Sequence, residues 1–272
     1  MRVASLCYHD VIPGSAFNAS GFPGAESASY KLDTVAFHRH LEAIEDEVMA
    51  HRNARRPGTV LDLLGGSLRQ RGCLLTFDDG GTSALTTIAP MLEDFGWRGH
   101  FFITTDYIGA PGFLTREQIV ELHRRGHVIG SHSCSHRGRM SSLPAERLVS
   151  EWGLSKEILS GLLGEEVVTA AVPSGYYARR VAEAAALVGI KALFTLEPQS
   201  LVESCGGCLV FGRYLVKRNL PPRLAGKLAV GSPYPCARQW MFWNVKKLAK
   251  SGLGGIYPRV RKAYFSWQRP AH

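Results

Sequence analysis

The amino-acid sequence predicts an α/β fold in which a parallel sheet curls into a closed but imperfect barrel. Short apolar runs alternate with stretches in which apolar residues recur at helical spacing, a pattern typical of parallel sheets. The chain has 272 residues, of which 45% are hydrophobic, so it can bury a substantial core. Seven apolar runs extend over about 215 residues, and no glycine-rich nucleotide-binding motif follows any of them. This favours a barrel over an open doubly wound sheet.

The strands and helices can be assigned in order along the chain. The seven runs predicted as strands are Val3–Tyr8, Cys73–Phe77, His100–Thr105, His127–Gly130, Val167–Val172, Lys191–Thr195 and Cys208–Val216. The segments predicted as helices are Val35–His51, Ser83–Phe95, Arg116–Arg125, Pro144–Leu163 and Arg179–Val188. Asp33 or Thr34 can cap the first of these helices.

A long loop rich in glycine, serine and proline, Gly14–Tyr30, follows the first predicted strand. Loops of this length in compact domains are usually functional or disordered. The carboxyl ends of barrel strands are also where active sites are built. We therefore expect this loop to lie beside a functional site.

Two adjacent carboxylates, Asp78 and Asp79, end the second predicted strand and are followed by Gly80 and Gly81. Two carboxylates side by side are unfavourable unless a cation neutralises them. Taken alone, the pattern is equally compatible with a solvated turn and a helix cap. A metal or acid–base site and a plain turn therefore both stay open for this motif.

A second polar motif, Gly130–His136, follows the fourth predicted strand. His132 and His136 are four residues apart, with small polar residues between them, so both imidazoles can converge on one metal ion. One aspartate and two histidines leave coordination positions open for water and substrate, as a catalytic metal requires. The second aspartate can then accept the proton of the water. A chance pairing of histidines is common, but both motifs at strand ends of one barrel favour a metal site.

Both motifs resemble those of a known family. Thr76–Gly80 and His132–His136 are similar, in order and spacing, to the first two motifs of the polysaccharide deacetylase family, also described as NodB-homology proteins or carbohydrate esterase family 4. The resemblance extends over about Val3–Val216. It implies a distorted (β/α)7 barrel and a metal-dependent hydrolysis that removes an N-acyl group from a sugar.

The resemblance assigns roles to the four residues of these motifs. Asp78 resembles the catalytic base, and Asp79, His132 and His136 resemble the metal ligands. The implied cofactor is a divalent metal, Zn²⁺ in the first place, with Co²⁺, Ni²⁺ or Fe²⁺ as alternatives.

A third motif is less distinct. Ala171 stands where the family usually has an arginine, and Pro173, Ser174, Gly175 and Tyr176 follow as expected substrate and oxyanion contacts. The backbone N–H of Ser174 is the expected oxyanion donor. Without the resemblance, this segment is simply a turn.

The late histidine that often supplies the general acid in this family is missing. No histidine lies between His136 and the terminal His272, and the last predicted strand carries none. His9, at the end of the first predicted strand, is the candidate general acid. A purely structural or substrate-binding role for His9 stays open.

Charge is distributed unevenly along the chain, whose formal net charge is +9. The first 203 residues carry 19 basic and 23 acidic residues, whereas the last 69 carry 13 lysines and arginines and no acidic residue. A mildly acidic body therefore precedes a strongly basic C-terminal part. We expect residues 1–228 to form the barrel and residues 229–272 to form a basic, aromatic-rich tail.

Within the tail, residue spacing predicts a short helix over Gln239–Lys250. Met241 and Val245 would share one side of this helix, and the lysines with Trp243 would lie on the other. The helix could pack on the barrel with its lysines solvated, or the tail could contact an anionic membrane surface. Nucleic-acid binding is the third interpretation, but we expect no nucleic-acid partner.

The sequence also bears on location and substrate. Met1–Tyr8 is too short for the apolar core of a secretory signal, and the six cysteines do not resemble a disulfide framework. We therefore expect a cytoplasmic protein, peripheral at the inner membrane face if the tail binds lipid. The expected reaction removes N-acetyl groups from an amino-sugar glycan or its intracellular precursor. The alternatives are a deformylase or deacetylase of a small lipid-linked sugar and a catalytically silent carbohydrate-binding barrel.

Overall fold

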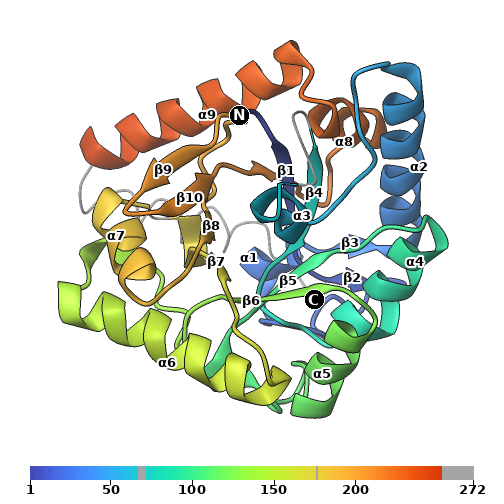
Figure 1. Ribbon diagram of the computed structural model, residues 1–272. Helices are drawn as coiled ribbons and strands as arrows, with labels where there is room; N and C mark the ends of the chain where they lie inside the picture. The colour runs from blue at the N-terminus through green and yellow to red at the C-terminus, as the bar shows by residue number, and fades with distance from the viewer. Residues whose placement is uncertain (67–71, 176, 253–272) are drawn as a thin grey trace.

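The computed structural model describes residues 1–66, 72–175 and 177–252, in which a central sheet is surrounded by helices (Figure 1). Neighbouring strands of this sheet follow the order β11-β1-β4-β5-β6-β7-β8-β10-β9, and all pairs are parallel except β10 with β9. The strands are β1 (Ala4–Tyr8), β4 (Cys73–Phe77), β5 (His100–Ile103), β6 (Val128–Ser131), β7 (Thr169–Ala171), β8 (Ala192–Phe194), β9 (Glu203–Cys205), β10 (Cys208–Phe211) and β11 (Tyr214–Leu215). All seven predicted strands are therefore present.

The last predicted strand is divided by Gly212 and Arg213 into β10 and β11. The first half pairs with β8 and the second half with β1, so this strand links the two sides of the curled sheet. Only glycine fits at the division, because a Cβ atom at Gly212 would lie 2.4 Å from the carbonyl oxygen of Glu197. The seven parallel strand positions confirm the predicted distorted (β/α)7 barrel.

The helices that cover the barrel lie in the predicted segments (Figure 1). These are α2 (Thr34–Ala50), α4 (Ala89–Asp94) preceded by a π-helical turn (Ala84–Ile88), α5 (Arg116–Arg124), α6 (Ala145–Leu163) and α7 (Arg179–Leu187). Asp33 accepts a hydrogen bond from the backbone N–H of Ala36 at 2.8 Å, so it caps α2 as expected. The sequence did not predict α1 (Ala25–Ala28), α3 (Val60–Leu64), α8 (Pro222–Ala229), the antiparallel strand β9, or the short β2 (Val11–Ile12) and β3 (Leu32–Asp33).

Aromatic side chains fill the inside of the barrel below the carboxyl ends of the strands. Phe194 lies between Phe102 and Phe211, with ring centroids 5.2 and 4.9 Å apart, and all three are buried. Such rings bury large apolar areas and stabilise one another by tilted or stacked contacts. Arg213 lies over the ring of Phe102, 5.7 Å from its centre, so this apolar layer is next to the charged residues of the strand ends.

The last described helix, α9 (Pro233–Gly252), runs along the outside of the barrel (Figure 1). The Gln239 side chain donates a hydrogen bond to the carbonyl of Leu215 at 3.2 Å, and Lys247 pairs with Glu197 at 3.0 Å. Met241 and Val245 instead face solvent. Helix α9 therefore contacts the barrel, but Met241 and Val245 lie on its exposed side. Among the helices of the described part of the chain, none is long and apolar enough to cross a membrane.

Candidate active site

The paired aspartates and both histidines of the sequence motifs meet at the carboxyl ends of β4 and β6. Asp78 and Asp79 directly follow β4, and His132 directly follows β6, one strand beyond the intervening β5. All three side chains are buried, and that of His136 is nearly so. Because parallel strands end at the same edge of a sheet, motifs 50 residues apart in the sequence become neighbours.

Asp79, His132 and His136 form a group that could hold a metal ion, since one ligand atom from each lies within 4.8 Å of the others. The Nε2 atoms of His136 and His132 lie 3.3 and 3.6 Å from the same carboxylate oxygen, Oδ1 of Asp79. Burial would raise the pKa of Asp79, but the hydrogen bond with His136 and the neighbouring histidines lower it. The aspartate is therefore available as an anionic ligand.

The tautomer of His132 is fixed by its surroundings. Its Nδ1 donates a hydrogen bond to the carbonyl oxygen of Ala171 at 2.9 Å, which leaves the lone pair of Nε2 directed at Asp79. Burial lowers the pKa of His132 to about 4, so the ring is neutral at physiological pH. Two imidazole nitrogens and one carboxylate form a donor set that fits a catalytic zinc ion with positions left for water and substrate.

The second aspartate is bound by Arg213, and its Oδ2 also lies 3.8 Å from Nε2 of His132. Nη1 and Nη2 of Arg213 donate to Oδ1 and Oδ2 of Asp78 at 2.6 and 2.8 Å. The same guanidinium donates to Thr76 Oγ1 at 3.1 Å and to the carbonyl of Thr195 at 3.0 Å. Burial alone would raise the pKa of Asp78, but the charge of Arg213 and its hydrogen bonds outweigh burial and hold the pKa well below its usual range.

Sequence reasoning missed Arg213. The signal for it was an arginine next to a glycine inside an apolar strand, in a part of the chain without any acidic residue to pair with it. A buried arginine requires a partner. That partner is found 135 positions earlier in the chain, at Asp78.

The loop that carries His136 is held by a buried glutamate that sequence reasoning also missed. Oε2 of Glu151, on α6, accepts hydrogen bonds from the backbone N–H groups of Cys134 and Ser135 at 3.1 and 3.0 Å. Oε1 of the same carboxylate accepts from the Ser135 hydroxyl at 2.6 Å. Helix α6 therefore fixes the loop between the two histidines.

Backbone strain is concentrated at the site. In the described part of the chain, four residues other than glycine have a positive φ, and they are Asp79, Ser133, His136 and Ser174. A left-handed conformation costs such residues on the order of 1–3 kcal/mol each, and it persists where surrounding contacts enforce it. All four belong to the three sequence motifs, which agrees with a site whose geometry is imposed by the fold.

His9 lies beside the aspartates. One of its ring nitrogens is within 4.8 Å of an Asp78 carboxylate oxygen, its Nδ1 is buried without a hydrogen-bond partner, and its ring stacks on Tyr30 at 5.2 Å. Cys7, His9 and Asp78 are also close enough together to hold a metal. This second group is the poorer metal site, because Arg213 already binds both oxygens of Asp78.

The loop Gly14–Tyr30 forms one side of the site, as its position predicted. The ring of Phe22 packs against that of His136, with centroids 4.7 Å apart. The buried ammonium of Lys31 fixes this loop by donating to three of its carbonyls, and Asp10 lies 3.7 Å from the same ammonium.

The third motif forms a tight turn, Pro173–Gly175, at the carboxyl end of β7, with Ser174 in the left-handed region at a φ of 55°. Pro173 and Gly175 are buried, and Ser174 is exposed. The turn begins two residues after Ala171, whose carbonyl binds His132. Tyr176 lies outside the described residues.

Part of the chain is similar to known proteins. Residues 65–193 match the family model for polysaccharide deacetylase. The protein YxkH of Bacillus subtilis (strain 168) is 30% identical over 125 residues, which cover 46% of this chain and 44% of YxkH. The matched part therefore spans less than half the length of that relative.

Solved structures share the fold. The deacetylase PplD of Streptococcus pyogenes, solved in complex with acetate, has a TM-score of 0.67 and 19% identity, with 86% of this chain and 99% of that chain covered. IcaB from Ammonifex degensii has a TM-score of 0.66 and 23% identity, with 84% and 97% covered. Residues 65–193, which carry both aspartates and both histidines, therefore match the polysaccharide deacetylase family model, in agreement with the resemblance of the two motifs.

Proposed function

We propose that this protein is a metal-dependent hydrolase that removes N-acetyl groups from an amino-sugar polysaccharide. The observation that carries this proposal is the separation of two adjacent carboxylates into different environments. Asp79 faces two histidines, whereas Asp78 is bound by Arg213. One carboxylate is thereby suited to ligate a metal and the other to accept a proton.

Asp79, His132 and His136 would hold the metal. Their nitrogen and oxygen donors favour Zn²⁺, and Co²⁺, Ni²⁺ and Fe²⁺ are compatible with the same set. When bound, such an ion supplies Lewis-acid chemistry, because it lowers the pKa of a water molecule and polarises the acetamide carbonyl.

Asp78 acts as the general base in this proposal. Its low pKa keeps the carboxylate ionised throughout the neutral range. Oδ2 accepts from both Arg213 and the Cys7 thiol, whereas Oδ1 retains a lone pair beside the one used by Arg213. It takes the proton of the water that attacks the acetamide carbonyl. Arg213 holds the carboxylate in one orientation during this transfer and balances its charge in the buried site.

His9 acts as the general acid and protonates the departing sugar amine. Its position beside Asp78 and its unpartnered, buried Nδ1 support this role. Asp78 could instead return the proton that it accepted. A His9→Gln variant separates the two routes: the first predicts a large loss of kcat, and the second predicts a kcat close to that of the wild type.

The turn after β7 supplies the oxyanion contact. The backbone N–H of Ser174 is the proposed donor, with Pro173, Gly175 and Tyr176 completing the substrate contact. Support comes from the position of the turn next to Ala171, the residue that binds His132.

The experiment is to measure acetate release from N-acetylglucosamine oligomers before and after chelation, and after addition of zinc or cobalt. We expect acetate release that chelation abolishes, that metal restores and that is lost in His132→Ala. A protein that binds metal but releases no acetate would point to another substrate. A protein that binds oligosaccharide without metal or turnover would support the silent binding barrel instead.

A lipid-linked amino sugar, as an intracellular precursor of the polysaccharide, is the second candidate substrate. The exposed aromatic and basic residues of α9 favour it, because such surfaces suit a bilayer where lipid-linked sugars reside. The test is acetate or formate release from a lipid-linked N-acyl amino sugar in detergent micelles, compared with the soluble oligomers. Faster release from the lipid-linked form would support it.

A further inference from the structure

Helix α9 presents an apolar face to solvent. Gln239, Trp243 and Lys247, spaced four residues apart, lie on the side toward the barrel, where Gln239 binds the carbonyl of Leu215 and Lys247 binds Glu197. On the opposite side of the helix, Tyr234 is 76%, Met241 52% and Val245 58% exposed. In a helix that only packs on a core the apolar side faces the protein, whereas in α9 these apolar residues face solvent.

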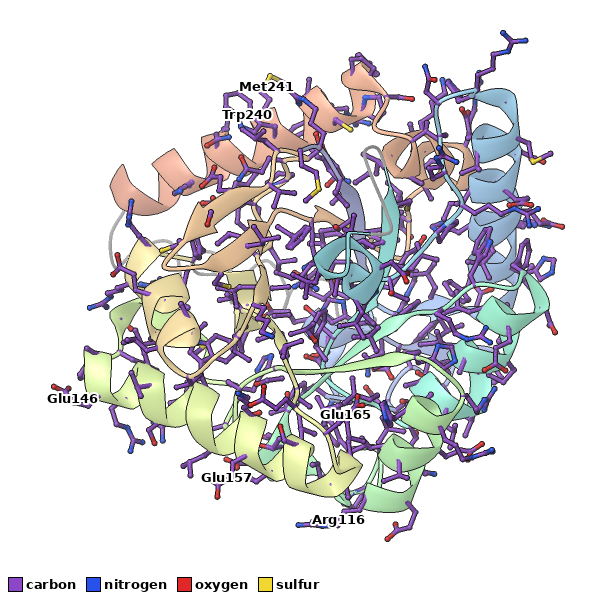
Figure 2. All side chains as sticks on the ribbon, viewed as in Figure 1. Arg116, Glu146, Glu157, Glu165, Trp240 and Met241 are labelled. Atoms are coloured by element: carbon purple, nitrogen blue, oxygen red, sulfur yellow. The ribbon has the colours of Figure 1, made fainter. Side chains whose placement is uncertain are left out.

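The exposed face is wider than these three residues. Trp240 is 56% exposed and Phe242 is 50% exposed. Figure 2 shows Trp240 and Met241 projecting outward from α9. Of the fourteen large apolar side chains exposed in the described residues, five lie on this one helix. Apolar residues that are gathered in this way mark an interaction site, whereas scattered ones do not.

The charge around this face identifies the kind of partner. The helix belongs to a segment after Glu203 that holds thirteen basic residues and no acidic one, of which Arg213 is buried in the site and Lys247 lies on the side toward the barrel. On the helix itself the guanidinium of Arg238 lies 5.5 Å from the centre of the Phe242 ring, and Arg238 is exposed. Aromatic and aliphatic side chains beside basic ones are the composition of helices that lie in the interface of anionic bilayers.

Other partners fit this face less well. A nucleic acid would be bound by charges that neutralise phosphates, and Met241 and Val245 at the centre of the face could not contribute to this. A second copy of the chain bound through the same face would bring two Arg238 side chains toward each other. An anionic lipid surface uses both the apolar and the basic residues.

We infer that α9 docks on the surface of an anionic lipid bilayer, with Tyr234, Met241 and Val245 inserted among the lipids. Docking would also hold the active site near the membrane. The partner of Lys247, Glu197, accepts a hydrogen bond from the backbone N–H of Arg213 through its carbonyl at 3.0 Å. The helix is thus joined to the strand that carries the arginine of the site.

The test is co-sedimentation of the full chain with vesicles of phosphatidylcholine alone or with about 30% phosphatidylglycerol. The test variant is Met241→Glu/Val245→Glu. The matched control is Met49→Glu/Val35→Glu on α2, where the same residue types are 72% and 59% exposed. Circular dichroism and thermal unfolding verify that both double variants fold as the wild type does.

We expect the wild type to bind vesicles containing phosphatidylglycerol, the control variant to bind equally, and the test variant to lose at least about tenfold in partitioning. Absence of wild-type binding, or equal loss in both variants, overturns the inference. The inference is also overturned if the wild type binds no vesicles and instead forms a concentration-dependent dimer that only the test variant abolishes. Binding of duplex DNA that is unaffected by Met241→Glu/Val245→Glu, in place of vesicle binding, overturns it as well.

Discussion

Arg213, from the last strand of the barrel, binds both carboxylate oxygens of Asp78, from the second barrel strand, at 2.6 and 2.8 Å. The third motif of the chain has Ala171 where the resemblance implies an arginine. Arg213 therefore supplies a guanidinium to the site from a different strand. The division of the last strand at Gly212 gives Arg213 this position, because β10 ends before it and β11 begins after it.

The substitution Arg213→Lys should weaken catalysis and shift its pH dependence. Lysine keeps the positive charge but cannot form the two parallel hydrogen bonds. We expect kcat to fall about 10–100-fold. The loss of these hydrogen bonds leaves the effect of burial less opposed, so the pKa of Asp78 should rise. The acid limb of the kcat/KM profile should therefore move to higher pH. Arg180→Lys, at an exposed arginine, is the control, and an unchanged acid limb in Arg213→Lys would refute this role.

Removal of one histidine from the proposed metal group should reduce metal binding directly. His136→Ala leaves Asp79 and His132 as the only ligands, so we expect its affinity for zinc to fall by at least about tenfold. The measurement is zinc content by mass spectrometry after gel filtration. His38→Ala, at an exposed histidine on α2, should retain the zinc of the wild type. Equal zinc content in His136→Ala and the wild type would contradict the assignment.

Lys31→Met should destabilise the loop that contacts the site. The ammonium binds the carbonyls of Phe17, Ser20 and Phe22, and its loss leaves these groups and the buried Asp10 without it. We expect the free energy of unfolding in urea to fall by about 3–5 kcal/mol. Lys191→Met, at an exposed lysine, is the control. If both variants unfold alike, Lys31 does not fix the loop.

His100 should make the protein less stable in mild acid. Its Nδ1 donates to the carbonyl of Leu75 and its Nε2 accepts from the N–H of Val60, both at 2.9 Å, so the native ring is neutral. Burial lowers the pKa of His100 from 6.5 to about 4. Between these values the unfolded chain binds a proton that the native chain does not, so stability falls as the pH falls.

The expected contribution of His100 is a loss of about 3 kcal/mol in the free energy of unfolding between pH 7 and pH 4. His100→Gln cannot titrate, so the loss over this range should be smaller by that amount. The measurement is urea unfolding of both proteins at several pH values. Parallel pH curves for the wild type and His100→Gln would show that this histidine does not carry the effect.

The barrel and four site residues were predictable because their signals are local. Each strand is a short apolar run, and Asp78 and His132 follow such runs directly. Once the sheet is parallel, strand ends must meet at one edge. The pairing of Asp78 with Arg213 was not predictable in this way, because it joins residues 135 positions apart and the Gly212–Arg213 pair in the last apolar run does not identify its partner.

The helix α9 shows a second limit of sequence reasoning. Periodicity predicted a helix there, and the helix exists, but it did not predict which side faces the barrel. That side is set by acceptors on other elements, the carbonyl of Leu215 and the carboxylate of Glu197. Glu151 was not predicted for a similar reason. Its partners are backbone N–H groups of a loop, and the residue types in the sequence do not show which backbone groups a side chain will bind.

The central claim is that Asp79 binds the metal and Asp78 accepts the proton, and one paired measurement tests it most directly. Zinc content and acetate release are measured on the same preparations of wild type, Asp78→Asn and Asp79→Asn. We predict that Asp78→Asn keeps the zinc of the wild type but loses about 10²–10⁴-fold in acetate release, while Asp79→Asn loses both. Wild-type acetate release by Asp78→Asn, or full zinc content in Asp79→Asn, would contradict the claim.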